Sequence, residues 1–205
     1  MIGREKNGRE QALPDHAKRI ACLGDSNTFG YAPGTPPGGR YPASVRWTGR
    51  LAEAAGQVFN RGQNGALIPR TGEYGAFAAL VQSLLPLDAL CVMYGTNDIL
   101  HFGTAAAAGE RMEAFLRALR PATGGAKLLL IAPVPLICGD WVRDAAVIAE
   151  SKALAEAYRR AADAQRVAFA DAAAWGVGLE FDGVHFTAAG HAAFFAGVNA
   201  ALSTL

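Results

Sequence analysis

The sequence lacks the features that mark a secreted, membrane-bound or nucleic-acid-binding protein. The N-terminal stretch MIGREKNGREQALPDHAKR is polar throughout and holds no apolar signal segment. Lys and Arg number 19 against 18 Asp and Glu, so the net charge is only +1, and the basic residues form no stripe. There is therefore no electrostatic footprint for nucleic acid or an anionic membrane. We expect a cytoplasmic protein whose partner is a small molecule.

Motifs for cofactors, metals and disulfides are also missing. No Gly-x-Gly-x-x-Gly is present, and the glycine-rich turn from Gly24 to Gly30 lacks the lysine of a phosphate-binding loop. The Gly-x-Ser-x-Gly elbow of α/β-hydrolases fails because Thr28 stands at its second glycine. The three cysteines, Cys22, Cys91 and Cys138, show no Cys-x-x-Cys spacing. We therefore expect no cofactor and no metal, with cysteines serving as small apolar side chains.

One long stretch without charge stands at the C-terminal end. Residues 187–205 contain no Asp, Glu, Lys or Arg, but alanines, glycines and His191 dilute their hydrophobicity. A membrane span needs about 20 predominantly apolar residues, so this stretch is too weak. We expect a helix that packs on a sheet or in an interface between identical chains.

What the sequence does hold is an alternation of buried strands and helices. With 205 residues, 51% hydrophobic and 18% charged, the chain can bury one core. Continuous rather than alternating apolar strands indicate a parallel sheet covered on both faces. We predict an α/β fold, a three-layer α/β/α sandwich with a five-stranded parallel sheet, formed by residues 19–205 after a polar extension, residues 1–18. The expected strands are 19–24, 57–60, 89–95, 127–133 and 167–172, and the expected helices are 46–56, 74–85, 108–120, 143–165 and 187–202.

Polar residues follow the predicted strands where ligands collect in such sheets. They are Gly24-Asp25-Ser26, the turn from Asn60 to Gly65, Gly95-Thr96-Asn97-Asp98, and Asp182 with His185. Together they supply a hydroxyl to attack, an imidazole to take its proton, an acid to hold the imidazole and N–H donors for an oxyanion.

Each of these residues also has an ordinary structural interpretation when it is taken alone. The Ser26 hydroxyl could cap a helix, and Asp182 and His185, three residues apart, could be a surface pair. For Asp98 we prefer a helix cap. Gly65 by itself indicates only a sharp backbone turn. Four such groups at one sheet edge, however, favour a catalytic site.

The four groups resemble the sequence blocks of the SGNH, or GDSL-type, hydrolases, and the resemblance runs from about residue 19 to the end of the terminal helix. This resemblance implies a flavodoxin-like sheet and a set of roles. Ser26 would be the nucleophile, His185 the general base and then acid, and Asp182 its orienting partner. The oxyanion would be held by the backbone N–H groups of Ser26 and Gly65 and by the Asn97 amide.

A narrower resemblance involves RYPASVRWTGRL (40–51) and IAPVPL (131–136), which are similar to segments of the bacterial arylesterase and acyltransferase branch. Some members of that branch transfer acetyl groups to alcohols or peroxide and form oligomers, so this resemblance and the uncharged last helix hint at a homo-oligomer. Two departures, Gly65-Ala66-Leu67 in the second block and Asn27 in place of the leucine of the GDSL name, put substrate preference in question. As substrate contacts we predict Asn27, Phe29, Trp47 and His101, although Trp47 could equally be helix packing.

We therefore expect a serine esterase that hydrolyses small, short-acyl esters through an acyl-enzyme. Alternatives are an acyltransferase or perhydrolase that uses the same acyl-enzyme, and a non-catalytic binding module. A metal-dependent phosphoesterase would need Asp25, Asp98, Asp182 and His185 as ligands. The cavity walls are expected from loops 30–44, 66–73, 99–106 and 136–142, whereas His191 and His16 are expected to be structural or exposed.

Overall fold

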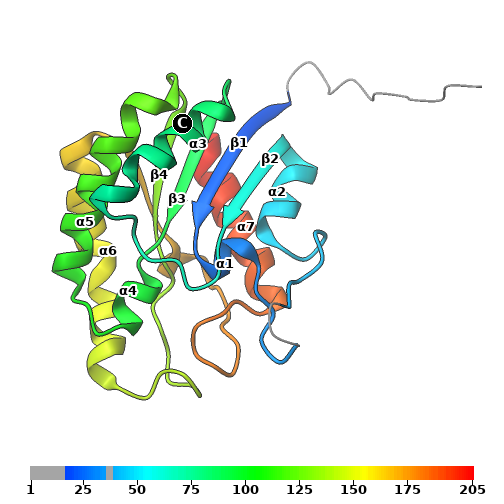
Figure 1. Cartoon of the computed structure of the whole chain (residues 1–205). Helices are drawn as coiled ribbons and strands as arrows, with labels where there is room; N and C mark the ends of the chain where they lie inside the picture. Colours follow the sequence, from blue (N-terminus) through cyan, green and yellow to red (C-terminus); the bar gives the residue numbers. More distant parts are fainter. Residues whose placement is uncertain (1–16, 36–38) are drawn as a thin grey trace, which may run out of the picture.

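The computed structural model of the protein describes residues 17–35 and 39–205, and its centre is a five-stranded sheet (Figure 1). The strands run in the order β2-β1-β3-β4-β5, and every neighbouring pair is parallel. This is the flavodoxin-like order, so the predicted sheet is confirmed. The strands are β1 (Lys18–Gly24), β2 (Gly56–Gly62), β3 (Ala89–Met93), β4 (Lys127–Ala132) and β5 (Ala168–Asp171).

Helices cover both faces of this sheet, as the continuous apolar strands predict (Figure 1). On one face lie α3 (Tyr74–Ser83), α5 (Ala105–Leu119) and α6 (Ala145–Gln165). On the other lie α2 (Trp47–Ala55) and α7 (Ala188–Ser203). Alternate residues of β1 serve the two cores: Ala21 and Leu23 face the first set of helices, and Ile20 and Cys22 the second. The protein is thus a three-layer sandwich.

Helix starts follow capping side chains rather than the apolar pattern alone. The side chains of Thr104, Asp144 and Thr187 accept hydrogen bonds from backbone N–H groups in the first turns of α5, α6 and α7. The cap at Thr104 explains why α5 begins three residues before the predicted position. The short elements are α1 (Ser26–Phe29), α4 (Thr96–Leu100) and the 3-10 turns η1 (Thr71–Glu73), η2 (Arg120–Thr123) and η3 (Ala172–Trp175).

The uncharged C-terminal stretch packs on the sheet. Phe194, Val198 and Leu202 of α7 are buried against residues of β1, β3 and β4. Within residues 17–35 and 39–205, no helix is long and apolar enough to cross a membrane. At the other end of the chain, β1 begins at Lys18, one residue before the start of the predicted strand 19–24. His16 lies outside the described residues.

The connections that follow the strands gather at one end of the molecule. In Figure 1 the strand arrows point toward the lower end, where α1, α4 and the loops after β4 and β5 lie. Because all five strands are parallel, their carboxyl ends meet at this edge, and polar residues from distant parts of the sequence are brought together there.

The aromatic packing under α7 gives a direct test of the core. Phe194 is fully buried, and its ring centroid lies 5.0 Å from those of Trp47, Trp175 and Phe186. We expect Phe194→Ala to lower the free energy of unfolding by about 3–5 kcal/mol, because the cavity it leaves is bounded by rigid rings. Urea unfolding measures this, with the exposed Phe181→Ala as control. A loss below about 1 kcal/mol would contradict this packing.

Candidate active site

The turn after β1 presents Ser26 at the start of a short helix. The Asp25 side chain caps this helix by accepting the Asn27 N–H at 2.9 Å, so Asp25, not Ser26, is the capping residue. Ser26 is the first residue of α1, and its backbone N–H therefore has no acceptor within the helix. Both its hydroxyl and its N–H are left for other partners.

Asp182 and His185 lie in a tight hairpin rather than on a helical turn. An antiparallel bridge between Leu179 and Phe186 closes the hairpin, and the Glu180 N–H donates to the His185 carbonyl at 2.7 Å. Asp182 Oδ1 accepts the backbone N–H groups of Val184 and His185 at 2.9 and 3.0 Å. The carboxylate is thereby fixed by the same turn that carries the imidazole.

A continuous chain of hydrogen bonds joins the acid, the imidazole and the hydroxyl. Asp182 Oδ2 lies 2.7 Å from His185 Nδ1, and His185 Nε2 lies 2.9 Å from Ser26 Oγ. Because the carboxylate can only accept, Nδ1 carries the hydrogen, and Nε2 is left to accept the serine proton. Burial alone would raise the pKa of Asp182, but the hydrogen bonds from the His185 ring and the hairpin N–H groups outweigh it and lower that pKa.

Two further polar groups face Ser26 from the ends of β2 and β3. Gly65 has a φ of +71°, which L side chains rarely adopt, and it lines the same cavity as Ser26. Asn97, on α4, donates one amide hydrogen to the Ala66 carbonyl at 2.9 Å. The second hydrogen of this amide remains for the cavity. Together with the Ser26 N–H, these groups can stabilise a developing oxyanion.

Asp98 does not cap α4, and our preferred interpretation of it is wrong. The cap position is Gly95, whereas Asp98 lies inside the helix with its carboxylate buried. One oxygen accepts the Ile68 N–H at 3.0 Å and the other pairs with Arg111 at 3.0 Å. Asp98 therefore fixes the segment that follows Gly65 against α4 and α5.

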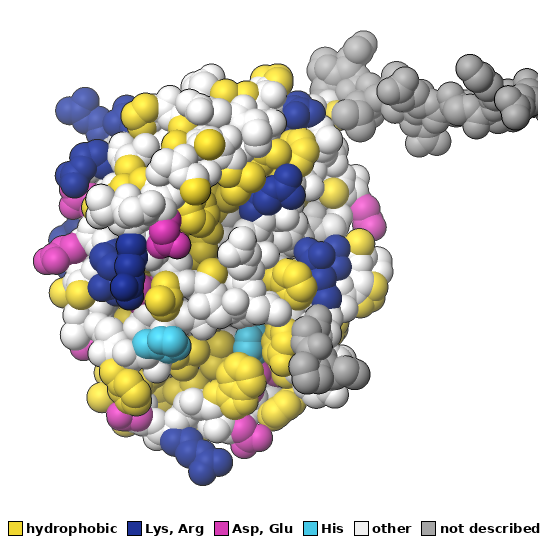
Figure 2. Space-filling model, viewed as in Figure 1, with side chains coloured by type: hydrophobic (Ala, Val, Ile, Leu, Met, Phe, Trp, Pro, Cys, Tyr) yellow, Lys and Arg dark blue, Asp and Glu magenta, His cyan; other side chains and the backbone are white. Residues whose placement is uncertain are grey.

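The cavity above Ser26 has a volume of about 380 Å³ and mainly apolar walls. Figure 2 shows hydrophobic side chains gathered over this end of the molecule. The ring centroids of Tyr31 and Trp141 lie 4.6 and 5.2 Å from that of His185. Three of the four predicted wall loops contribute Tyr31, Leu100 and Trp141, but loop 66–73 does not. The lining residues are Ser26, Tyr31, Asn64, Gly65, Asn97, Leu100, Trp141, Val184 and His185.

Asn27, predicted as a substrate contact, does not line the cavity. Its side chain is buried, and its amide bridges the two residues that flank His185: Nδ2 donates to the Val184 carbonyl at 3.1 Å, and Oδ1 accepts the Phe186 N–H at 3.0 Å. Asn27 thus attaches the histidine hairpin to the serine turn. Its position beside the serine could have suggested a supporting role, but the sequence cannot show where its amide points.

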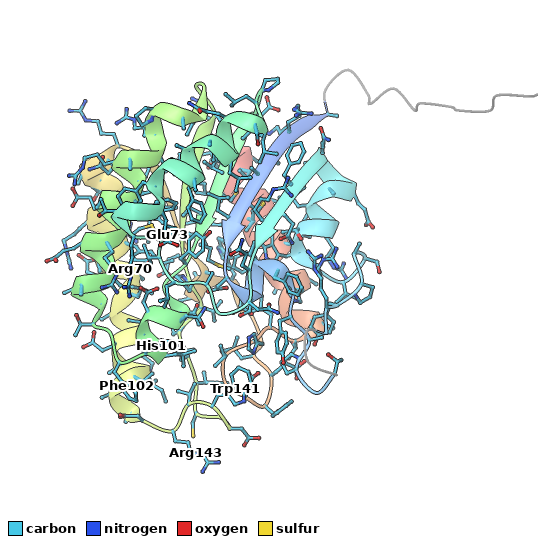
Figure 3. All side chains as sticks on the ribbon, viewed as in Figure 1. Arg70, Glu73, His101, Phe102, Trp141 and Arg143 are labelled. Carbon is cyan, nitrogen blue, oxygen red and sulfur yellow. The ribbon has the colours of Figure 1, made fainter. Side chains whose placement is uncertain are left out.

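The other three predicted contacts also lie outside the cavity walls. Trp47 is 1% exposed, and its indole Nε1 donates to the Asn27 carbonyl at 3.0 Å, so the packing interpretation of Trp47 is the correct one. Phe29 packs under the Arg40 guanidinium, 4.3 Å from the ring centroid. His101 is exposed at the C-terminal end of α4, where Figure 3 shows it near Phe102. The lining aromatics are Tyr31 and Trp141 instead.

Two buried titratable groups lie close to the site without joining the hydrogen-bond chain. His191 of α7 is fully buried between Tyr41 and Phe186, and burial first, then the charges of Arg46 and Arg50, lowers its pKa from 6.5 to about 4. Burial raises the pKa of Asp25 from 3.8 to about 6, although the Asn27 N–H opposes this. Across the described ranges, no group of three or more His, Cys, Asp or Glu side chains is arranged to hold a metal ion.

These two pKa shifts predict opposite effects of acid on stability. Between pH 6.5 and about 4, the unfolded chain protonates His191 before the folded chain does, so this residue lowers the free energy of unfolding as pH falls. Asp25 takes up its proton in the folded state first, near pH 6, and raises the free energy of unfolding as pH falls. We expect acidification from about pH 7 to about pH 4.5 to destabilise His191→Gln less than the wild type, and Asp25→Asn more, by about 2 kcal/mol each.

Urea unfolding at the two pH values measures both differences, and the two variants act as each other's control. If both variants shift in the same direction, the assigned protonation of these groups is incorrect.

Comparisons with known proteins agree with this geometry. Residues 22–193 match the model of the GDSL-like lipase/acylhydrolase family. A comparison with curated protein sequences gave no match. Among solved structures, the aryl esterase of M. smegmatis is similar, with 28% identity and a TM-score of 0.79 over 92% of this chain and 98% of that one.

Two other solved structures extend the comparison. A protein from Agrobacterium tumefaciens str. C58 assigned as an arylesterase has 31% identity and a TM-score of 0.77, over 91% of this chain and 99% of that one. A carbohydrate acetylesterase family member from Sinorhizobium meliloti has 26% identity and a TM-score of 0.77, also over 91% and 99%. The resemblance to SGNH hydrolases and their arylesterase branch is confirmed. The chain belongs to the GDSL-like lipase/acylhydrolase family and is a carboxylic ester hydrolase.

Proposed function

We propose that this hydrolase is a serine esterase that cleaves small, short-acyl carboxylic esters through an acyl-enzyme on Ser26. The observation that carries the proposal is the hydrogen-bond chain from Asp182 through His185 to Ser26, with contacts of 2.7 and 2.9 Å. A hydroxyl becomes an effective nucleophile when a base lies within hydrogen-bond reach and a third group orients that base.

The reaction follows from these contacts. Ser26 Oγ attacks the ester carbonyl while His185 Nε2 takes the serine proton, and the oxyanion accepts hydrogen bonds from the Ser26 and Gly65 N–H groups and the Asn97 amide. Collapse of this intermediate breaks the ester bond, and His185 gives its proton to the departing alcohol. Water, deprotonated by His185, then attacks the acyl carbon, the bond from this carbon to Ser26 Oγ breaks, and His185 returns the proton to Ser26 Oγ as the carboxylic acid leaves.

The cavity supports a small substrate with a short acyl group. A volume of about 380 Å³ lies at the lower end of the range for small-molecule sites, and Tyr31, Leu100, Trp141 and Val184 give it mainly apolar walls. Among the similar structures, the carbohydrate acetylesterase family member supports an ester of a short acid, and the two arylesterases support an ester as the substrate.

Acyl transfer to an alcohol or peroxide draws no support from the segment that suggested it. In RWTG, Trp47 is buried under the Asn27 carbonyl, and Arg46 donates to the Tyr41 carbonyl at 2.6 Å. Neither side chain lines the cavity, so this segment supports the serine turn and not an acceptor site. We therefore propose hydrolysis alone.

Covalent labelling tests the nucleophile. We expect a fluorophosphonate to modify Ser26 in the wild type and to leave a folded Ser26→Ala variant unlabelled and inactive on 4-nitrophenyl acetate. Asn97→Ala should keep the nucleophile but lose about 10²–10³-fold in kcat, because one oxyanion donor is removed. Peptide mapping and steady-state kinetics measure these effects. An unlabelled wild-type Ser26, or a change below threefold in Asn97→Ala, would contradict the respective role.

The bridge formed by Asn27 predicts a positioning role that kinetics can separate from folding. In Asn27→Leu both hydrogen bonds to the histidine hairpin are lost, and a shift of the imidazole by about 1 Å can cost on the order of 10²-fold in rate. We expect kcat and the rate of fluorophosphonate labelling to fall together by about 10–10²-fold, with KM within about threefold.

Phe29→Leu serves as the matched control for this experiment, because Phe29 lies in the same short helix but packs under Arg40. We expect it to keep wild-type kcat. If Asn27→Leu unfolds more easily but labels at the wild-type rate, the role of Asn27 is structural only.

A further inference from the structure

A second hollow adjoins the cavity above Ser26. Its volume is about 270 Å³, and it shares two walls, Leu100 and Trp141, with the main cavity. In Figure 3, Phe102 and Trp141 lie on opposite sides of this region, with Arg143 below them. The lining residues are Leu100, Phe102, Asp140, Trp141, Val142, Arg143, Asp144 and Val147. A substrate held at Ser26 can therefore extend past Trp141 into this hollow.

The position of Trp141 indicates which part of an ester would reach the hollow. His185 must give its proton to the departing oxygen, so the alcohol part of the ester lies on the His185 side of the cavity. The Trp141 ring meets the His185 ring edge-on at 5.2 Å. The hollow behind Trp141 is therefore on the alcohol side.

The wall between the two hollows is attached to the histidine hairpin. The Trp141 N–H donates to the Asp182 carbonyl at 3.2 Å, and the Asp140 N–H donates to the Phe181 carbonyl at 3.0 Å. At Gly139 the two segments approach so closely that an added Cβ would lie 2.5 Å from the Asp182 carbonyl carbon. The backbone of this wall is thus held in place by the histidine hairpin.

Phe102 adopts a backbone conformation that its residue type disfavours. Its φ is +60° at the end of α4, where glycine is the usual residue, and its side chain is 81% exposed. A bulky residue in this region of φ is strained, and such strain clusters at ligand-binding sites. Trp141 is 57% exposed as well, so two largely exposed aromatic side chains flank the hollow.

Charged groups complete the lining of the hollow. Asp144 is already used, because its Oδ1 accepts the Ala146 N–H at 2.8 Å and caps α6. Asp140 and Arg143 are exposed, and neither forms an ion pair with any side chain in the described ranges. The Asp140 carboxylate can accept hydrogen bonds and the Arg143 guanidinium can donate them. Beside two aromatic side chains, these groups suit a ring that carries hydroxyl groups.

We propose that this hollow binds the alcohol part of the ester, and that this alcohol is a sugar, so that the substrate is an O-acylated carbohydrate. The apolar face of the sugar ring packs against Trp141 and Phe102, and its hydroxyls bond with Asp140 and Arg143. This inference rests on the proposed esterase function.

The test compares esters of one acid with three alcohols. We expect kcat/KM of the wild type to be higher for a mono-O-acetylated methyl glucopyranoside than for ethyl acetate. In Phe102→Ala and in Arg143→Ala the ratio of these two values should fall at least tenfold. Phe181→Ala and Arg70→Ala are matched controls, because Phe181 is 58% exposed, Arg70 is also exposed, and neither lines the hollow. Both controls should keep the wild-type ratio.

The remaining arms separate this proposal from the esterase itself. The sugar would be overturned in favour of a plain aromatic alcohol by one pattern. In that pattern, Phe102→Ala lowers kcat/KM relative to ethyl acetate equally for the glucopyranoside ester and for phenyl acetate, whereas Arg143→Ala lowers neither. If the loss of kcat/KM in Phe102→Ala and Arg143→Ala changes with the length of the acyl chain while the alcohol is kept the same, the assignment of the hollow to the alcohol side is overturned. If Ser26→Ala abolishes ethyl acetate hydrolysis but Phe102→Ala and Arg143→Ala keep the wild-type ratio of kcat/KM values, the esterase function is upheld and the sugar site is refuted.

Discussion

The site depends on one side-chain amide that joins the two ends of the fold. Ser26 follows the first strand, and His185 arrives 159 residues later on a hairpin beyond the last strand. Asn27 accepts the Phe186 N–H and donates to the Val184 carbonyl, so it holds both neighbours of the histidine. The hairpin contributes no strand to the sheet, so these two bonds, together with the backbone bonds from the Trp141 segment, hold the imidazole against the hydroxyl.

The bridge is effective because it is neutral and buried. An amide donates and accepts at once and can satisfy both an N–H and a carbonyl, whereas a carboxylate could satisfy only the N–H. The Trp47 indole bonds the Asn27 carbonyl and closes the bridge from the α2 side. Each unpaired backbone group here would cost about 1–3 kcal/mol, so alternative arrangements of the hairpin are disfavoured. The placement of His185 against Ser26 is therefore a consequence of hydrogen-bond satisfaction in the core.

Most of the fold and the residues that meet at the carboxyl end of the sheet could be predicted from the sequence, whereas the residues that line the cavity could not. Apolar strands and helical periodicity depend on local patterns, and parallel strands bring their carboxyl ends together in any such sheet. Asn27 was misassigned because closeness to Ser26 in sequence says nothing about side-chain direction. Tyr31 and Trp141 reach the cavity through loops whose course depends on long-range bonds, such as that from the Trp141 N–H to the Asp182 carbonyl.

The hydrogen bond from the Trp141 N–H to the Asp182 carbonyl links a wall of the cavity to the histidine hairpin. The segment that carries Trp141 and the hairpin that carries His185 share backbone hydrogen bonds and a glycine contact, so they form one body at the edge of the sheet. A change in the Trp141 segment that alters this contact would also move the imidazole. Leu100, by contrast, lies on α4 together with Asn97, and Phe102 follows the C-terminal end of this helix. The proposed alcohol side is thus enclosed by two separate elements, one tied to His185 and the other to Asn97. Substitutions at the exposed tips of the Trp141 and Phe102 side chains can therefore alter the hollow while His185 and Asn97 keep their positions.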